Sequence, residues 1–186
     1  LGAKVFLDGA RLLYAAAALD VKPIELALPA DMVSISLVKG IGALGGAVLC
    51  GRQVDIDNAF RNMQLLGGNA FHRAGIIAAS GLIALRDMPG RLKEDIRRAR
   101  AFAGKVAEID TLDIDLANVQ SNIVMVGIEG TGLSSSQFLE KMKARGLLGH
   151  QFTENIVRFT FHSGITDLDV NKSYDIIKNL IGEVSN

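Results

Sequence analysis

The sequence has 186 residues, enough for one ordinary domain or two small ones with a core that buries roughly 70% of the unfolded surface. A hydrophobic content of 49% with only 5% aromatic residues suits buried strands covered by helices. Twenty basic and twenty acidic residues cancel to a net charge of +0, which argues against a nucleic-acid-binding protein, and the single Cys50 excludes an internal disulfide.

Two further classes of protein are disfavoured by the composition. Three histidines and one cysteine are a poor supply of ligands for a structural zinc site, so we expect no metal. No apolar run reaches the roughly 18 residues that cross a membrane, and no secretory signal precedes the first strand. We therefore expect a cytoplasmic protein with no membrane or nucleic-acid partner.

The first half of the chain alternates short strands with helices. The predicted elements are a strand at 4–7, a helix at 10–19, a helical turn from Pro23 to Pro29, strands at 32–38 and 47–50, and helices at 55–66 and 70–85. In the second strand Val33, Ile35 and Leu37 share one face, as expected for a strand that packs against a core.

Pro89 and Gly90 mark the clearest boundary, and a long amphipathic helix follows them. Its apolar positions are three or four residues apart, at Leu92, Ile96, Ala99, Phe102 and Val106. The remaining predicted elements are strands at 112–116, 123–128 and 156–161, a helix at 136–145 and a last helix that Thr166 and Asp169 begin as a capping box. The sequence therefore predicts an α/β fold in two domains, 1–89 and 90–186.

A glycine-rich segment follows the second strand and allows two interpretations. Residues 40–45 match the dinucleotide-binding pattern G-x-G-x-x-G, which needs a helix that begins at the glycines. Only four apolar residues separate Gly46 from Gly51, too few for that helix, so the dinucleotide interpretation fails. The second interpretation centres on Lys39, because a lysine at the carboxyl end of a buried strand lies where α/β folds bind ligands and is a candidate nucleophile.

Asp8 also ends a short strand, and together with Lys39 it points to a cofactor. Each residue has an ordinary alternative: Lys39 as a solvated loop lysine, and Asp8 as the N-cap of the helix that follows. A lysine and a carboxylate at two strand ends are nevertheless what pyridoxal phosphate needs. The lysine holds its aldehyde, and the acid keeps its pyridine nitrogen protonated.

Four blocks of sequence resemble the threonine aldolase and β-eliminating lyase family, which comprises pyridoxal-phosphate enzymes of fold type I. Residues 4–12 (KVFLDGARL) resemble the family's "hLDGARL" signature, and residues 34–46 resemble its "SVSxxLSKGLGAPVG" segment. Residues 66–76 and 156–162 are similar to its "LGGGMRQAGVLAA" helix and "iRlVTH" strand. The resemblance implies the C-terminal portion of such an enzyme, namely part of the large sheet domain in 1–89 and the small α/β C-terminal domain in 90–186.

The resemblance also implies roles for individual residues. Lys39 would hold the cofactor, Asp8 would pair with its pyridine nitrogen, and Ser36 would contact its phosphate. Arg11 and Arg158 would bind the substrate carboxylate. For Arg158 the strand pattern agrees, because alternate residues from Ile156 to His162 share one face while Val157, Phe159 and Phe161 face the core; a solvated strand arginine is the alternative.

The chain departs from the family pattern at three places. Val38 stands where the family has a small hydroxyl residue, and the stretch from Gly67 to Arg73 is one residue longer than the pattern. His72 and Arg73 are therefore rival counterparts of a family arginine that reaches the cofactor phosphate across a subunit interface. The first residue is Leu1 rather than Met, and the family's amino-terminal half is absent, so we expect that something upstream has been lost.

The function implied by the resemblance is an aldolase that cleaves a β-hydroxy-α-amino acid, of the L-threonine or L-allo-threonine type, to glycine and an aldehyde. Family members are dimers or tetramers, so a homo-oligomer is expected. The alternatives are another fold-type-I reaction, β-elimination or transamination, or a catalytically silent chain that acts only in assembly.

Overall fold

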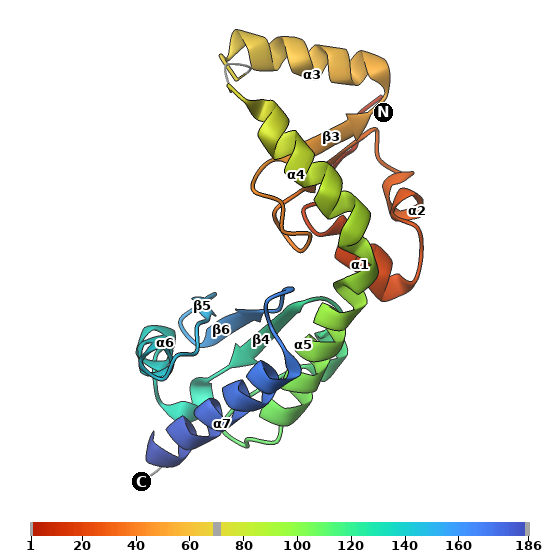
Figure 1. The fold of residues 1–186 in the computed structure, drawn as a ribbon. Coiled ribbons are helices and arrows are strands. Elements are labelled where there is room, and N and C mark those ends of the chain that lie inside the picture. Colours follow the sequence, from red (N-terminus) through yellow and green to blue (C-terminus); the bar gives the residue numbers. More distant parts are fainter. Residues whose placement is uncertain (1, 69–71, 185–186) are drawn as a thin grey trace. The chain divides into compact units, whose positions relative to one another are not determined.

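The computed structural model describes residues 2–68 and 72–184, and the chain divides into two compact units, Leu1–Leu92 and Lys93–Asn186 (Figure 1). We call them the amino-terminal and carboxyl-terminal units and describe each by itself. The division lies just beyond Pro89, where a single 3-10 turn (Pro89–Arg91) leads into the next helix.

A three-stranded sheet organises the amino-terminal unit. Its strands, in spatial order, are β1 (Phe6–Asp8), β2 (Met32–Ser36) and β3 (Ala47–Gly51). β1 runs parallel to β2 with Asp8 opposite Ser34, and β3 runs antiparallel to β2 with Ala47 opposite Ser36. The carboxyl ends of β1 and β2 therefore lie at the same end of the sheet.

The helices of this unit are close to the predicted ones. They are α1 (Leu12–Leu19), α2 (Pro23–Ala27), α3 (Gln53–Leu65) and α4 (Ala74–Asp87). The predicted start of the fourth helix, at residue 70, lies outside the described residues, and residues 72 and 73 form a turn rather than helix. Residues 40–46 are all described, and the third strand follows them directly, so no helix begins at those glycines.

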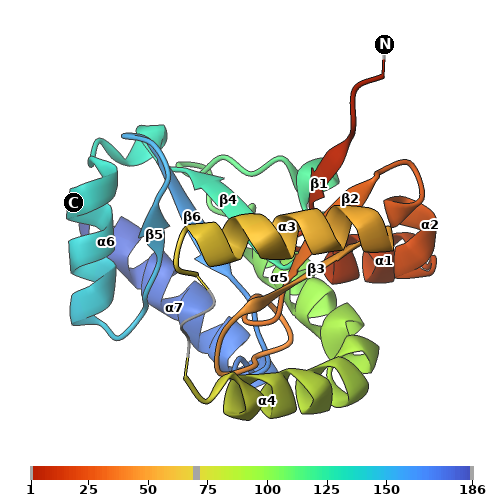
Figure 2. The ribbon, with the colours of Figure 1, turned by 90° about the horizontal axis from the view of Figure 1, so that it is seen from above.

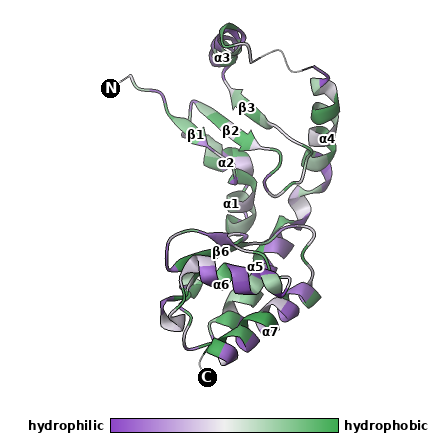
Figure 3. Ribbon diagram, turned by 90° about the vertical axis from the view of Figure 1, so that its left-hand side faces the viewer, coloured by the Kyte–Doolittle hydropathy of each residue, from purple (hydrophilic) through white to green (hydrophobic). Residues whose placement is uncertain are grey.

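Burial in the amino-terminal unit is confined to a small core. Tyr14, Val33, Leu37 and Ile41 are buried between α1, β2 and the loop after it. All five residues of β3 are exposed, and α4 is hydrophobic along much of its length while Leu82 remains 71% exposed (Figure 3). This unit therefore leaves much of its apolar surface uncovered in the described structure.

A charged cluster ties together the opposite end of this sheet. The Asp55 carboxylate is buried in the first turn of α3, where it pairs with Lys4 and accepts a 3.0 Å hydrogen bond from Arg52 Nε. The hydrogen bond from Lys4, followed by that from Arg52, holds the pKa of Asp55 below its usual value, against the effect of desolvation. Asp31 accepts a 2.8 Å bond from the Val5 amide and lies beside Arg52, so this cluster fixes the chain before β1.

The carboxyl-terminal unit has an antiparallel sheet in the order β4 (Ile123–Gly127), β6 (Ile156–Thr160) and β5 (His150–Gln151). Its helices are α5 (Leu92–Val106), α6 (Ser135–Ala144) and α7 (Asp167–Val184). The end of α7 lies beside α6 (Figure 2), and Arg145, just after α6, pairs with Glu183.

One continuous core fills this unit. The five apolar positions that define the face of α5 are all buried, as their spacing predicts. Phe102 on α5 packs against Phe159 and Phe161 with ring centroids 5.2 and 5.4 Å apart. These aromatic contacts join the helix to the sheet.

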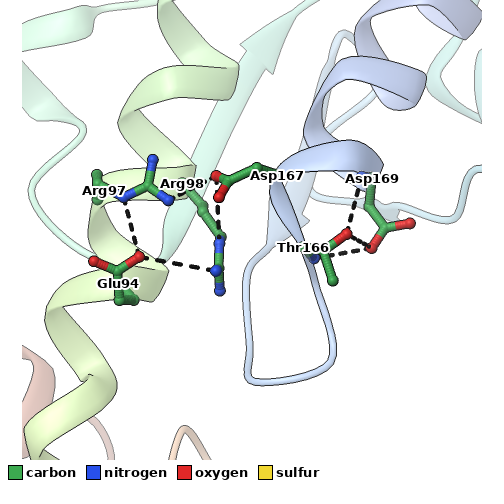
Figure 4. A network of polar contacts seen from close by, with 6 residues as sticks. All are labelled: Glu94, Arg97, Arg98, Thr166, Asp167 and Asp169. Carbon is green, nitrogen blue, oxygen red and sulfur yellow. Dashed lines mark hydrogen bonds and ion pairs between the residues drawn. The ribbon is translucent and has the colours of Figure 1, made fainter.

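Polar contacts fix the start of α7 (Figure 4). Arg97 donates a 2.6 Å hydrogen bond to Asp167, which ties α5 to α7 and, by that bond, lowers the pKa of the Asp167 carboxyl. The predicted capping box is confirmed: the Thr166 amide donates to Asp169 Oδ2 at 2.8 Å, and the Asp169 amide donates to Thr166 Oγ1 at 3.3 Å.

The predicted strand at 112–116 is wrong. These residues are all described, and they form one isolated bridge, between Asp113 and Gly127, before a 3-10 turn at Leu116–Asn118. Asp115 explains the difference, because its carboxylate accepts a hydrogen bond from the Ala117 amide at 3.1 Å and so stabilises a turn in place of extended chain.

Candidate functional site

The end of the first sheet at which β1 and β2 both finish brings together three of the predicted site residues. Asp8 is the last residue of β1, Ser36 is the last residue of β2, and Lys39 lies three residues further, in the loop to β3. This parallel pair is what places Asp8 and Lys39 at the same end of the sheet.

Asp8 leads into a tight turn rather than capping the helix. The Gly9 amide donates to Ser34 O at 2.8 Å, and a Cβ at Gly9 would lie 2.9 Å from the same oxygen, so only glycine fits against β2 here. Asp8 Oδ1 accepts a hydrogen bond from the Ala10 amide at 3.1 Å. The N-cap of α1 is the half-buried Arg11, so the alternative assignment of Asp8 as the N-cap is wrong.

Lys39 stands on a closed loop. The Leu37 amide donates to Gly46 O at 3.1 Å, and the Ala43 amide donates to Leu37 O at 2.9 Å. Lys39 itself is exposed. Desolvation would make this amine a better nucleophile, and the residues that the structure describes do not bury it.

Ser36 has its hydroxyl engaged inside this loop. Its Oγ accepts a 3.2 Å hydrogen bond from the backbone amide of Lys39. A contact between Ser36 and a phosphate stays a prediction, since an acceptor hydroxyl still has a proton to donate.

His72 and Arg73 lie in the turn that begins α4, and both are exposed. Arg73 has φ 62°, in the left-handed region, and is the N-cap of the helix. Both residues are exposed in the same turn, so the assignment of one of them as the phosphate ligand stays a prediction.

Arg158 lines a cleft of about 540 Å³ that belongs wholly to the carboxyl-terminal unit. Thr160 and His162 line the same cleft, while Val157, Phe159 and Phe161 are buried, which confirms the predicted division of β6 into two faces. The role of Arg158 stays a prediction.

The side chain of Arg158 is not simply solvated. Its Nε atom is buried and has no hydrogen-bond partner among the described residues. A buried, unpaired guanidinium nitrogen costs free energy unless a ligand accepts its hydrogen bond. This cleft is therefore suited to an anion such as a carboxylate.

Sequence reasoning missed other residues of this cleft. His150 lies directly opposite Arg158 in the β5–β6 pair, and Lys172 and Asp169 contribute from α7. The Asp169 carboxylate is already engaged by Thr166, whose hydrogen bonds lower the pKa of Asp169. β5 is two residues long and follows glycines, so its pairing left no periodic signal to detect.

The fold is that of an α/β protein, and its architecture matches two solved structures. A protein from Listeria monocytogenes provisionally named an L-allo-threonine aldolase superposes over 96% of this chain and 52% of its own, with a TM-score of 0.77 and 19% identity. A protein from Exiguobacterium, provisionally named an aromatic amino acid β-eliminating lyase/threonine aldolase, gives a TM-score of 0.78 over the same shares. The predicted fold class is confirmed.

The sequence comparison is more specific. The family model described as β-eliminating lyase matches residues 1–129, and this chain belongs to that family. It is 30% identical over 171 residues to low-specificity L-threonine aldolase 1 of Arabidopsis thaliana, covering 91% of this chain and 48% of the plant protein. It is 32% identical over 166 residues to the low specificity L-threonine aldolase of Escherichia coli K12, covering 89% and 46%. The chain thus spans about half the length of these relatives.

Proposed function

We propose that this chain forms the lysine-bearing part of a pyridoxal-phosphate-dependent aldolase that cleaves a β-hydroxy-α-amino acid to glycine and an aldehyde. The observation that carries the proposal is the placement of Asp8 and Lys39 at one end of a parallel strand pair. The names of the relatives support the aldolase activity, and membership of the family supports a lyase.

The residues present fit pyridoxal phosphate. The Lys39 amine is exposed and makes no ion pair or hydrogen bond with the residues that the structure describes, so it is available for the cofactor aldehyde. Asp8 supplies a carboxylate for the pyridine nitrogen, and the orphaned Arg158 Nε supplies an anion site. When bound, the cofactor supplies an electron sink for the pair of electrons left on the α-carbon.

The remaining side chains then bind and orient. Arg11 and Arg158 are each candidate ligands of the substrate carboxylate, because a planar guanidinium matches two carboxylate oxygens. Ser36 and either Arg73 or His72 bind the cofactor phosphate. Asp8 holds a proton on the ring nitrogen, which keeps the ring electron-withdrawing.

A test begins with the chain itself. Pyridoxal phosphate is added, the mixture is reduced with borohydride, and the modified peptides are mapped by mass spectrometry. Modification concentrated at Lys39, and lost in Lys39→Ala, supports the cofactor role. Modification spread evenly over the exposed lysines contradicts it. Aldol cleavage is then measured in a longer chain that also contains the part of the relatives' length that this chain does not cover.

A second candidate reaction is β-elimination, which the description of the family favours. Product analysis separates the reactions, because aldol cleavage gives glycine and an aldehyde whereas β-elimination gives a keto acid and ammonia. Amino-group exchange would instead indicate transamination.

We also propose a homo-dimer or homo-tetramer in the cytoplasm. The exposed apolar surface of the amino-terminal unit supports association, and the single Cys50 suits a reducing compartment. None of the helices in the described ranges has both the length and the apolar character needed to span a bilayer.

A further inference from the structure

Residues on two sides hold the segment that bears Lys39. The family resemblance does not assign them a role in positioning this lysine. The loop from Leu37 to Gly46 turns Leu37, Ile41 and Ala43 inward and leaves Lys39 at the surface. The position of the lysine is therefore set by the backbone on either side of it.

The first contact lies on the amino-terminal side. Ser36 Oγ accepts the Lys39 amide hydrogen bond at 3.2 Å, across three residues. The acceptor is a side chain at the end of a strand, so it joins the lysine backbone directly to β2.

The second contact lies on the carboxyl-terminal side. Gly40 has φ +89°, and a Cβ built there would lie 2.3 Å from Cε2 of Tyr14. Tyr14 is 1% exposed and belongs to α1, the helix that begins just after Asp8 and Arg11. The ring therefore fills the space above the residue next to Lys39.

We propose that Tyr14 and Ser36 are positioning residues that together hold Lys39 at the end of β1 and β2. Ser36 fixes the lysine relative to β2, and Tyr14 fixes it relative to α1, the helix that follows Arg11. In this arrangement the hydroxyl of Ser36 acts on the lysine backbone. The proposal rests on the proposed function only in taking Lys39 as the cofactor lysine.

The experiment uses paired variants of the chain. Ser36→Ala removes the acceptor and Ser36→Thr restores it, while Tyr14→Leu removes the ring and Tyr14→Phe keeps it. Three quantities are measured: hydrogen exchange at the Lys39 amide, acylation of Lys39 by a succinimidyl ester, and borohydride-stable attachment of pyridoxal phosphate. Acylation of the exposed Lys22 is the internal standard, and that of Lys4, which pairs with Asp55, reports whether the unit stays folded.

The expected result is specific to Lys39. Loss of the hydrogen bond raises exchange at the Lys39 amide about fivefold in Ser36→Ala, and Ser36→Thr reverses it. Cofactor attachment at Lys39 falls about tenfold in Tyr14→Leu, since small displacements of a reacting group cost rate steeply, and is kept in Tyr14→Phe. Lys22 and Lys4 do not change.

Each other outcome decides a separate question. If pyridoxal phosphate attaches to Lys39 equally in all variants, positioning by these residues is wrong and the proposed function stands. If it attaches in none, including the unmodified chain, the proposed function loses its lysine, and the exchange and acylation of Lys39 decide the positioning alone. If Tyr14→Leu exposes Lys4 as well, the two Ser36 variants decide the positioning, and unchanged exchange in Ser36→Ala overturns the proposal.

Discussion

Replacing Arg158 with Met is expected to stabilise the carboxyl-terminal unit while removing its capacity to bind a carboxylate. The buried Nε has no partner among the described residues, and an unsatisfied buried donor costs about 1–3 kcal/mol. Met keeps an apolar stem against the sheet and removes that donor. Because Arg158 lines the cleft and is not wholly enclosed, we take the lower end, about 1 kcal/mol.

This gain is measurable in thermal unfolding. For a unit of this size, about 1 kcal/mol raises the midpoint of thermal unfolding by about 4–8 °C. Circular dichroism monitors this transition, and hydrogen exchange in β6 assigns it to the carboxyl-terminal unit. The affinity for a small carboxylate such as glycine is expected to fall by about 100-fold, since the lost hydrogen bonds are charge-assisted. Binding is monitored through the imidazole resonances of His150.

Arg145→Met is the matched control, because Arg145 lies in the same unit and both of its terminal nitrogens are hydrogen-bonded. It donates to Lys141 O at 2.9 Å and pairs with Glu183, so its replacement is expected to lower stability by up to about 1 kcal/mol. If Arg158→Met lowers the midpoint as Arg145→Met does, Nε has a structural partner and the reasoning for an anion site fails.

Three further predictions concern packing, charge and capping. Phe102→Ala is expected to cost about 3–5 kcal/mol in urea unfolding, against less than about 0.5 for the exposed Phe152→Ala; equal losses would contradict the assigned core. The pKa of Asp55 is lowered in the folded chain, so the contribution of its carboxylate to the free energy of unfolding is present above the usual Asp pKa and is lost as the pH falls through the folded pKa. The destabilisation by Asp55→Asn should therefore shrink on acidification, and a pH-independent loss would refute the role of the Lys4 pair. Thr166→Ala is expected to lower the free energy of unfolding by about 1 kcal/mol, because it removes the capping box. An unchanged denaturant midpoint would contradict this role of Thr166.

Local patterns predicted the elements that carry their own signal. The spacing in α5 is a property of one helix, so its buried face was readable without knowing its neighbours. The two faces of β6 were equally readable, because alternate residues of a strand point to opposite sides. The same local patterns predicted the end of β1 to within one residue of Asp8, whereas β2 ends at Ser36, so Lys39 lies three residues into the loop rather than at the end of the strand.

Features that depend on distant pairing could not be read in this way. β5 exists only because His150 meets Arg158 across the sheet, and nothing in the sequence near residue 150 indicates a strand. The strand predicted at 112–116 failed because a single side-chain acceptor, Asp115, favours a turn. The contact between Tyr14 and Gly40 joins a helix to a loop and leaves no sequence pattern at all.

The two units differ in how completely their apolar side chains are buried. In the carboxyl-terminal unit the large apolar side chains converge in one core, whereas in the amino-terminal unit β3 is exposed and an apolar groove of about 560 Å³ lies between β3 and α4. Carbanion chemistry requires a site from which water is excluded. The described residues leave the Lys39 amine exposed and do not supply a wall around it. Under the proposed function we therefore expect further polypeptide to enclose that amine, and the relatives are about twice as long as this chain.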